Sequence, residues 1–118
     1  MRDKSPVPIR RFAQLSAPRQ AFVRLCQSIN FGEIRGIVLR NSEPMFNPLP
    51  TVLVDVTIRA KREPRDETVL SDFALRDDVL SLLGWFDELK NAWIERIEVR
   101  SGTPRRIVYE QPLTGMLQ

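Results

Sequence analysis

Histidine is absent from this chain of 118 residues, and cysteine occurs once, as Cys26. The first absence excludes Ser-His-Asp and Cys-His catalytic pairs and histidine-ligated metals, and a lone cysteine excludes internal disulfides and cysteine-cluster zinc sites. The five glycines are scattered along the chain, at Gly32, Gly36, Gly84, Gly102 and Gly115. This scatter excludes a phosphate-cradling loop and a dinucleotide-binding fingerprint. We therefore predict a protein that is not an enzyme and that has no cofactor.

Long hydrophobic runs are also missing. The most apolar stretch, residues 79–86, contains Ser81 and Gly84 and is far shorter than the ~20 residues that span a bilayer. The N-terminus carries positive charges without the apolar run of a signal peptide. A lone cysteine on an apolar helical face is typical of a reducing compartment, so we expect a cytoplasmic protein without a membrane partner.

Basic residues outnumber acidic ones by 18 to 15, and the excess is concentrated in the first twenty residues. The rest of the chain is close to neutral, and residues 71–98 are acidic. Charge alone therefore supports a polyanion partner only through local basic clusters.

The composition, 42% hydrophobic and 28% charged, is that of a single globular domain. Residues 1–15 carry Pro6 and Pro8 with little periodicity, so we predict a flexible basic N-terminal arm there. The domain is expected over residues 16–110, followed by a C-terminal tail over residues 111–118.

Two amphipathic helices are predicted from apolar residues at helical spacing. The first begins at Ser16, which can cap its first turn, with Pro18 preset to helical φ, and Gly32 is its expected end. The second begins between residues 71 and 78. Their apolar stripes are Phe22, Leu25, Cys26 and Ile29 in the first and Leu75, Val79, Leu82, Phe86 and Leu89 in the second. Within its stripe, Cys26 is expected to be a packed core residue without a nearby base.

Five strands are predicted as two hairpins and a single strand between them. The first hairpin has its strand at residues 37–39, its turn at Asn41-Ser42 and a short return strand, and the second spans residues 93–109 around Ser101-Gly102. The strand between them, residues 51–59, alternates apolar and polar residues, so its apolar face is expected to pack on the core. That apolar face comprises Val52, Val54, Val56 and Ile58. Residues 60–68 form the expected solvated loop.

The two helix-plus-hairpin units correspond at an offset of sixty residues. Ile34, Ile37, Leu39, Arg40 and Pro44 fall on Ile94, Ile97, Val99, Arg100 and Pro104. We interpret this as an internal αββ repeat, the alternative being a chance match between two common units. The predicted fold is a two-layer α+β domain of order α-β-β-β-α-β-β, with two helices on one face of an antiparallel sheet.

Several short motifs lie within this plan: Leu25–Ile34, Arg40, Glu43-Pro44, Ile94–Val99 and Gly102-Thr103-Pro104. In these motifs the chain resembles a group of small uncharacterised bacterial proteins, between about residues 22 and 109. The most specific part is Ile-Asn-Phe-Gly-x-Ile ahead of the first hairpin, and Ser42 departs from the glycine expected in the turn. The resemblance implies a bacterial source and a complete domain, and it carries no site residue.

Paired carboxylates occur at Asp77-Asp78 and at Asp87-Glu88. Convergent carboxylates could hold a divalent cation, but the first pair falls where a helix's first turn favours negative charge. The second pair flanks the apolar stripe on its solvated sides. We predict no metal site and no catalytic role for either pair.

Basic side chains form three candidate phosphate contacts: the arm, the loop after the middle strand and the last strand. These residues are Arg10, Arg11, Arg59, Lys61, Arg62, Arg65, Arg105 and Arg106. Binding of single strands also needs exposed aromatics on the sheet. Tyr109 is the expected candidate, because we place Phe31, Trp85, Phe86 and Trp93 in the core.

By elimination, the predicted function is that of a non-enzymatic binding or adaptor module. Its partner is expected to be another protein or a second copy, docked on the outer sheet face or an edge strand. Leu53, apolar on the polar face of its strand, favours this prediction. The alternative is a basic nucleic-acid-binding accessory protein that uses the arginines of the arm and loop.

Overall fold

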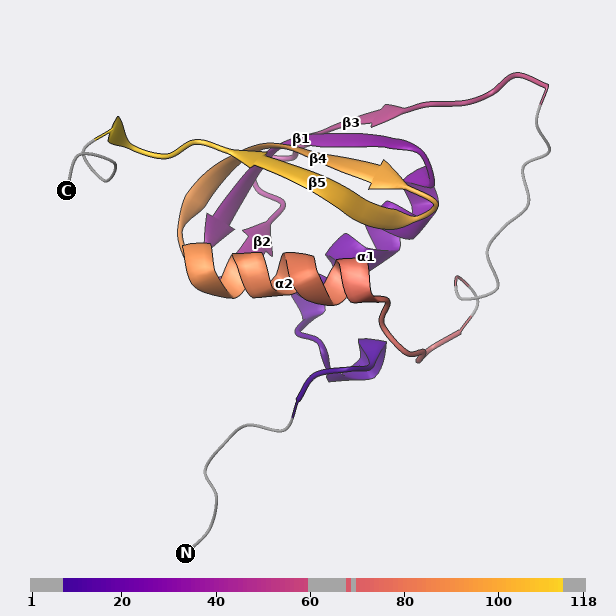
Figure 1. Cartoon of the computed structure of the whole chain (residues 1–118), viewed down its shortest axis with the longest axis horizontal. Coiled ribbons are helices and arrows are strands. Elements are labelled where there is room, and N and C mark those ends of the chain that lie inside the picture. The colour runs from indigo at the N-terminus through magenta and orange to yellow at the C-terminus, as the bar shows by residue number, and fades with distance from the viewer. Residues whose placement is uncertain (1–7, 60–67, 69, 114–118) are drawn as a thin grey trace, which may run out of the picture.

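The computed structural model describes residues 8–59, 68 and 70–113 (Figure 1). Its elements are η1 (Phe12–Gln14), α1 (Ala17–Ile29), β1 (Gly32–Arg40), β2 (Glu43–Met45), β3 (Thr51–Val54), α2 (Asp77–Leu89), β4 (Ala92–Arg100) and β5 (Thr103–Tyr109). The five strands form one antiparallel sheet, and both helices lie on the same side of it (Figure 1). The predicted two-layer α+β fold and its order of helices and strands are confirmed.

Strands β1 and β4 form the centre of the sheet, whose order is β2-β1-β4-β5. Strand β3 also pairs with β1, along residues 32–35, while β2 pairs with residues 38–40. The two short strands therefore share one side of β1 and make up one edge of the sheet. The other edge is β5, which pairs with β4.

The core lies between the helices and the central strands. Four isoleucines of β1 and β4, Ile34, Ile37, Ile94 and Ile97, have no exposed surface. Above them the rings of Phe22 and Phe86 pack edge to face, with centroids 5.5 Å apart. Burial of large apolar side chains contributes about 1.5–3 kcal/mol each, so this layer is the main source of stability.

The two halves follow the same backbone course. Helices α1 and α2 begin and end sixty residues apart, as do β1 and β4. The register pairs Ile34 with Ile97 and Ile37 with Ile94. At the sixty-residue offset Ile97 is the counterpart of Ile37, so Ile34 pairs with the counterpart of Ile37, and the reverse is also true. The halves are therefore related by an approximate two-fold axis perpendicular to the sheet. The hairpin turns also match, with positive φ at Asn41-Ser42 and at Ser101-Gly102 as the two-residue turns require.

Glycine 32 does not end the first helix, as we predicted, but begins β1. The helix ends at Ile29, and Asn30 follows it with a φ of 64°. A Cβ on Gly32 would overlap the carbonyl oxygen of Leu53. The glycine is therefore needed for the close approach of β3 to the start of β1.

Residues before Ser16 pack against the domain more than the prediction of a flexible arm over residues 1–15 implies. Phe12 and Leu15 are each 5% exposed and belong to the core. The Phe12 ring stacks on Phe73 at 4.8 Å, and the Phe12 N–H donates to the Phe73 carbonyl. Partners sixty residues away thus order a segment whose own pattern is too short to indicate structure. Residues 1–7 lie outside the described chain.

The prediction for residues 51–59 is wrong in length and in burial. Strand β3 ends at Val54, and the four apolar side chains predicted to face the core are all exposed. The alternation holds within β3, where Val52 and Val54 lie opposite Ile34 and Gly32, but β3 borders only residues 32–35 of β1. An edge position leaves them beside the helical layer and not beneath it.

Candidate interaction surface

Residues 51–59, here called the β3 segment, contain five of the twelve exposed large hydrophobic residues of the described chain. Val52 is 36% exposed, Leu53 41%, Val54 56%, Val56 41% and Ile58 95%. Single exposed apolar residues are ordinary, but a run of five along nine residues is typical of a surface that another molecule covers.

The register with β1 places Val52 and Leu53 on opposite faces of the sheet edge. Val52 pairs with the buried Ile34, so it points to the helical side. Leu53 pairs with Glu33 and points to the outer face, which carries no helix (Figure 1). A strand laid alongside would therefore meet apolar groups on both faces.

One backbone edge of β3 has no strand beside it. Within the described residues, β3 pairs with β1 alone. The Asp55 N–H donates to the Phe31 carbonyl across 2.7 Å, on the β1 side. Because successive N–H groups of an extended chain point in opposite directions, the N–H of Val54 points away from β1.

The β3 segment lacks most of the features that protect edge strands. Edge strands are commonly blunted by lysine, proline or inward-pointing charges. Here residues 51–54 are Thr-Val-Leu-Val, proline occurs only before them at Pro50, and the segment's only charges are Asp55 and Arg59. The sequence is therefore suited to pairing with another strand.

The outer face of the sheet is a second exposed surface. Trp93 is 42% exposed and packs over Gly36, where an added Cβ would come within 3.2 Å of the indole ring. Arg35 and Arg96 are directly opposite each other on the central strands. Arg35 forms an ion pair with Glu33 at 2.5 Å. This face combines an aromatic ring with adjacent guanidinium groups, which we did not predict.

The aromatic predictions are partly wrong. Phe86 is buried as predicted, but Phe31, Trp85 and Trp93 are 42–44% exposed. Tyr109 pairs with the buried Ile94 and packs against the core, so it is not the exposed aromatic of the sheet. Strand alternation decides the positions of Trp93 and Tyr109, whereas Trp85 lies on the solvent side of α2 and Phe31 precedes β1.

The predicted basic residues do not come together in one patch. Arg11 is held by an ion pair with Asp72 at 2.7 Å, and Arg10 is exposed beside it. Arg59 follows β3, whereas Arg105 and Arg106 lie on β5, at the opposite edge of the sheet. Arg106 is 3.8 Å from Glu98. Three further predicted residues, Lys61, Arg62 and Arg65, lie outside the described residues.

Arg19 is a buried charge that the sequence analysis missed. It is 7% exposed, and its Nη2 donates to Asp87 at 2.5 Å and to the Ser42 carbonyl at 2.9 Å. Its Nε lies 3.6 Å from Glu43, which also accepts from the Ser16 hydroxyl. We call these five residues the Arg19 cluster. The cluster ties α1 to the first hairpin turn and to α2.

Further residues with reactive or ionisable side chains are the aspartates at the start of α2, Cys26 and Asp72. Asp77 and Asp78 lie in the first turn of α2, as predicted. Cys26 is 1% exposed, and burial raises the pKa of its thiol to about 12. Hydrogen bonds from the Arg11 side chain and the Ala13 backbone lower the pKa of Asp72. Within the described residues, no three histidine, cysteine, aspartate or glutamate side chains are grouped to hold a metal ion.

No family model, curated protein or solved structure matches this chain. Among the described residues, no helix has the length and apolar character needed to cross a membrane. The resemblance to small bacterial proteins and the expected compartment stay predictions.

Proposed function

We propose that this protein is a non-enzymatic binding module that pairs the free edge of β3 with an extended strand of a partner protein. The observation that carries this proposal is the exposure of five apolar side chains along the β3 segment. Strand addition suits such a surface, because backbone hydrogen bonds supply affinity and alternate side chains supply specificity.

Contact between the apolar side chains of the β3 segment and water is unfavourable, and a partner that covers them gains free energy. Apolar surface is worth about 25 cal/mol per Å² when removed from water, and the β3 segment offers it on both faces of the sheet edge. The outward N–H of Val54 supplies a backbone donor at the same place. A partner strand would satisfy the donor and cover the valines together.

Val54→Pro tests the backbone part of the proposal. Proline removes the outward N–H and leaves the bonds to β1 in place, since the neighbouring Asp55 N–H is the one that points to β1. Val54→Lys tests the apolar part. Leu113→Lys is the matched control, because Leu113 is 67% exposed and lies outside the β3 segment.

The measurement has two stages. Light scattering over a concentration series determines whether the partner is a second copy, in which case both Val54 variants become monomers and Leu113→Lys does not. If the wild type is a monomer, a library of displayed peptides is selected on it and counter-selected on Val54→Pro. Monomeric wild type together with no peptide that distinguishes it from Val54→Pro would overturn the proposal.

Nucleic-acid binding is the second candidate, favoured by the outer face with Trp93, Arg35 and Arg96. Guanidinium groups contact phosphates, and an exposed indole can stack on a base. Fluorescence anisotropy with labelled single-stranded RNA and duplex DNA at two salt concentrations tests it. Affinity that falls with salt and is weakened by Arg96→Ala and Trp93→Ala would support this candidate, and absence of binding at low salt would remove it.

A further inference from the structure

Strand β3 ends at Val54, but the chain continues past it in nearly the same direction, beyond the end of the sheet (Figure 1). Val56 and Ile58 lie on this continuation and are 41% and 95% exposed. Before the first residue of β3, Leu49 is 84% exposed. Leu49 and Ile58, the two most exposed large apolar residues of the described chain, therefore flank β3 at opposite ends.

We propose that the partner of the β3 edge is a second copy of this chain, whose β3 pairs antiparallel with it about a two-fold axis. This inference rests on the proposed function, because it names the partner of the same edge. Two-fold dimers are the commonest oligomers, and their interface must complement itself. Antiparallel pairing brings the start of one strand beside the end of the other, so Leu49 of each copy lies near Ile58 of its partner.

The backbone groups of β3 that face the open edge belong to Val52 and Val54. The Asp55 N–H donates to the Phe31 carbonyl, on the β1 side. In an antiparallel ladder the N–H and C=O of one residue point to the same side, and successive residues alternate. All of the outward groups are satisfied when Val52 of one copy pairs with Val54 of the other. This register places Leu53 on the two-fold axis.

The residues of the β3 segment disfavour the neighbouring registers. An axis one residue earlier pairs an outward carbonyl with Pro50, which has no N–H to donate. An axis one residue later places Leu53 opposite the charged Asp55 of the other copy, and an axis two residues later places the two Asp55 carboxylates opposite each other. With the axis at Leu53, Asp55 lies opposite Thr51, whose hydroxyl donates to the carboxylate.

The pairing centred on Leu53 also matches the side chains on both faces of the sheet. On the helical side, Val52 of each copy meets Val54 of the other, and on the outer face the two Leu53 side chains meet. Apolar cross-strand pairs of this kind stabilise a sheet. The three residues are 36–56% exposed in the single chain, so the second copy removes a continuous apolar strip from water.

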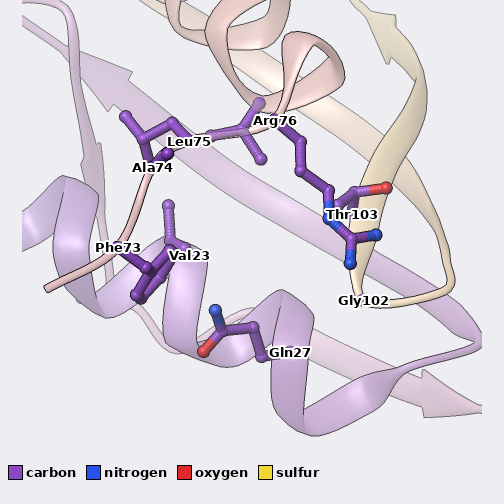
Figure 2. A pocket seen from close by; sticks show the side chains of 9 residues that line it. Val23, Gln27, Phe73, Ala74, Leu75, Arg76, Gly102 and Thr103 are labelled. Carbon is purple, nitrogen blue, oxygen red and sulfur yellow. The ribbon is translucent and has the colours of Figure 1, made fainter. Parts of the chain in front are cut away.

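A hollow on the helical side of the molecule is separate from this edge. It is a cavity of about 230 Å³ between α1, the start of α2 and the turn that joins β4 to β5 (Figure 2). None of the residues that line it belongs to the β3 segment. Its buried Gln27 already accepts a hydrogen bond from Arg24 at 3.0 Å. The pairing of two copies does not depend on this cavity.

Cysteine cross-linking tests the register. Two copies of Leu53→Cys place their Cα atoms about 4.5 Å apart, as a disulfide requires, whereas two copies of Val54→Cys are diagonal neighbours about 7–8 Å apart. Each full-length variant is oxidised in a glutathione buffer and followed on non-reducing gels. Native Cys26 is 1% exposed and does not compete. We expect Leu53→Cys to form a disulfide dimer at least tenfold faster than Val54→Cys, and equal rates would overturn the proposal.

Leu53→Lys tests the same register without a new covalent bond. The introduced lysine faces Glu33 within its own chain, so the fold is preserved, but across the axis it faces a second lysine. We expect the dimer dissociation constant, measured by light scattering, to rise at least tenfold, whereas the exposed change Leu113→Lys leaves it unchanged. An axis at Val54 would place each lysine opposite Asp55, so a tighter dimer would overturn the proposed register.

Failure of this inference is distinguishable from failure of strand pairing itself. A wild type that stays monomeric at every concentration would overturn the second copy as the partner. A displayed peptide that binds this monomer and does not bind Val54→Pro would still support strand pairing with another protein. A wild-type dimer that Leu53→Lys leaves unchanged would overturn the proposal, because its contact would lie outside β3.

Discussion

Ser42 donates its backbone N–H to the carbonyl oxygen of Lys90 across 2.8 Å, which joins the turn of the first hairpin to the end of α2. Gly102 makes the corresponding bond to Asn30 at 2.9 Å, from the second hairpin to the end of α1. Each helix is thus tied to the hairpin of the other half. Because the C-terminal end of each helix is held by the hairpin of the other half, we expect the domain to unfold as one unit.

The acceptors of these bonds have an unusual backbone. Lys90 has φ 62° and ψ −59°, and the Asn91 N–H donates to the Leu89 carbonyl at 2.7 Å, which closes a γ-turn with positive φ. Such turns are strained by about 1–3 kcal/mol for residues with a Cβ. We expect Lys90→Gly to raise the free energy of unfolding by about 1 kcal/mol in urea titrations. Lys90→Ala keeps the Cβ, so a gain of equal size in that variant would contradict the explanation.

Arg19 is expected to contribute more to stability than its acidic partners. Arg19→Ala leaves a buried space and removes the bonds to Ser42 and Asp87, so we expect a loss of about 2 kcal/mol or more. The Asp87 side chain is 65% exposed, so Asp87→Asn should cost less than about 1 kcal/mol. Urea unfolding of the two variants measures the difference, and equal losses would mean that Arg19 acts only as a surface ion pair.

Cys26 should resist thiol reagents in the folded protein. Its pKa rises from 9.0 to about 12 because burial disfavours the thiolate, which lowers the thiolate fraction about thousandfold. We expect labelling by a disulfide reagent at pH 8 to become fast only in denaturant. Ser28→Cys in a Cys26→Ala background is the exposed control on the same helix and should react at once. Rapid labelling of native Cys26 would show that α1 opens locally.

Asp72 links stability to acidic pH through Arg11. The Arg11 side chain and the Ala13 N–H lower the pKa of this carboxyl in the folded state below its ordinary value of 3.8. A lowered folded-state pKa adds stability above the unfolded pKa and loses it as the pH falls through the folded value. Arg11→Gln should therefore raise the Asp72 pKa toward 3.8 in a carboxyl NMR titration. An unchanged pKa would assign the lowered pKa to the backbone N–H groups of Ala13 and Phe73.

The helices were predictable because their signals are local. Apolar residues at helical spacing identify the face of α1 that holds Phe22 and Cys26 and the face of α2 that holds Phe86, and all three are buried. Ser16 caps α1 as predicted. Turn residues such as Asn41 tolerate positive φ wherever the rest of the chain goes. These features depend on neighbours within a few positions.

The candidate sites depend on contacts between distant parts of the chain. The alternation correctly places Val52 and Leu53 on opposite faces of the sheet, but only the sheet order shows that β3 lies at an edge, beyond cover by the helices. Arg19 is buried because Ser42 and Asp87 approach it from 23 and 68 residues away. Gln27 lies beside a cavity that Val79 and Thr103 also line, from 52 and 76 residues away.

The sequence by itself determined the elements, their order and the excluded chemistries, because periodicity, caps, turns and missing residue types are properties of the chain alone. Tertiary structure decided which apolar residues are exposed, which charges are buried and where a cavity remains. Burial is set by what packs against a residue, and that depends on sheet order and on where each helix ends.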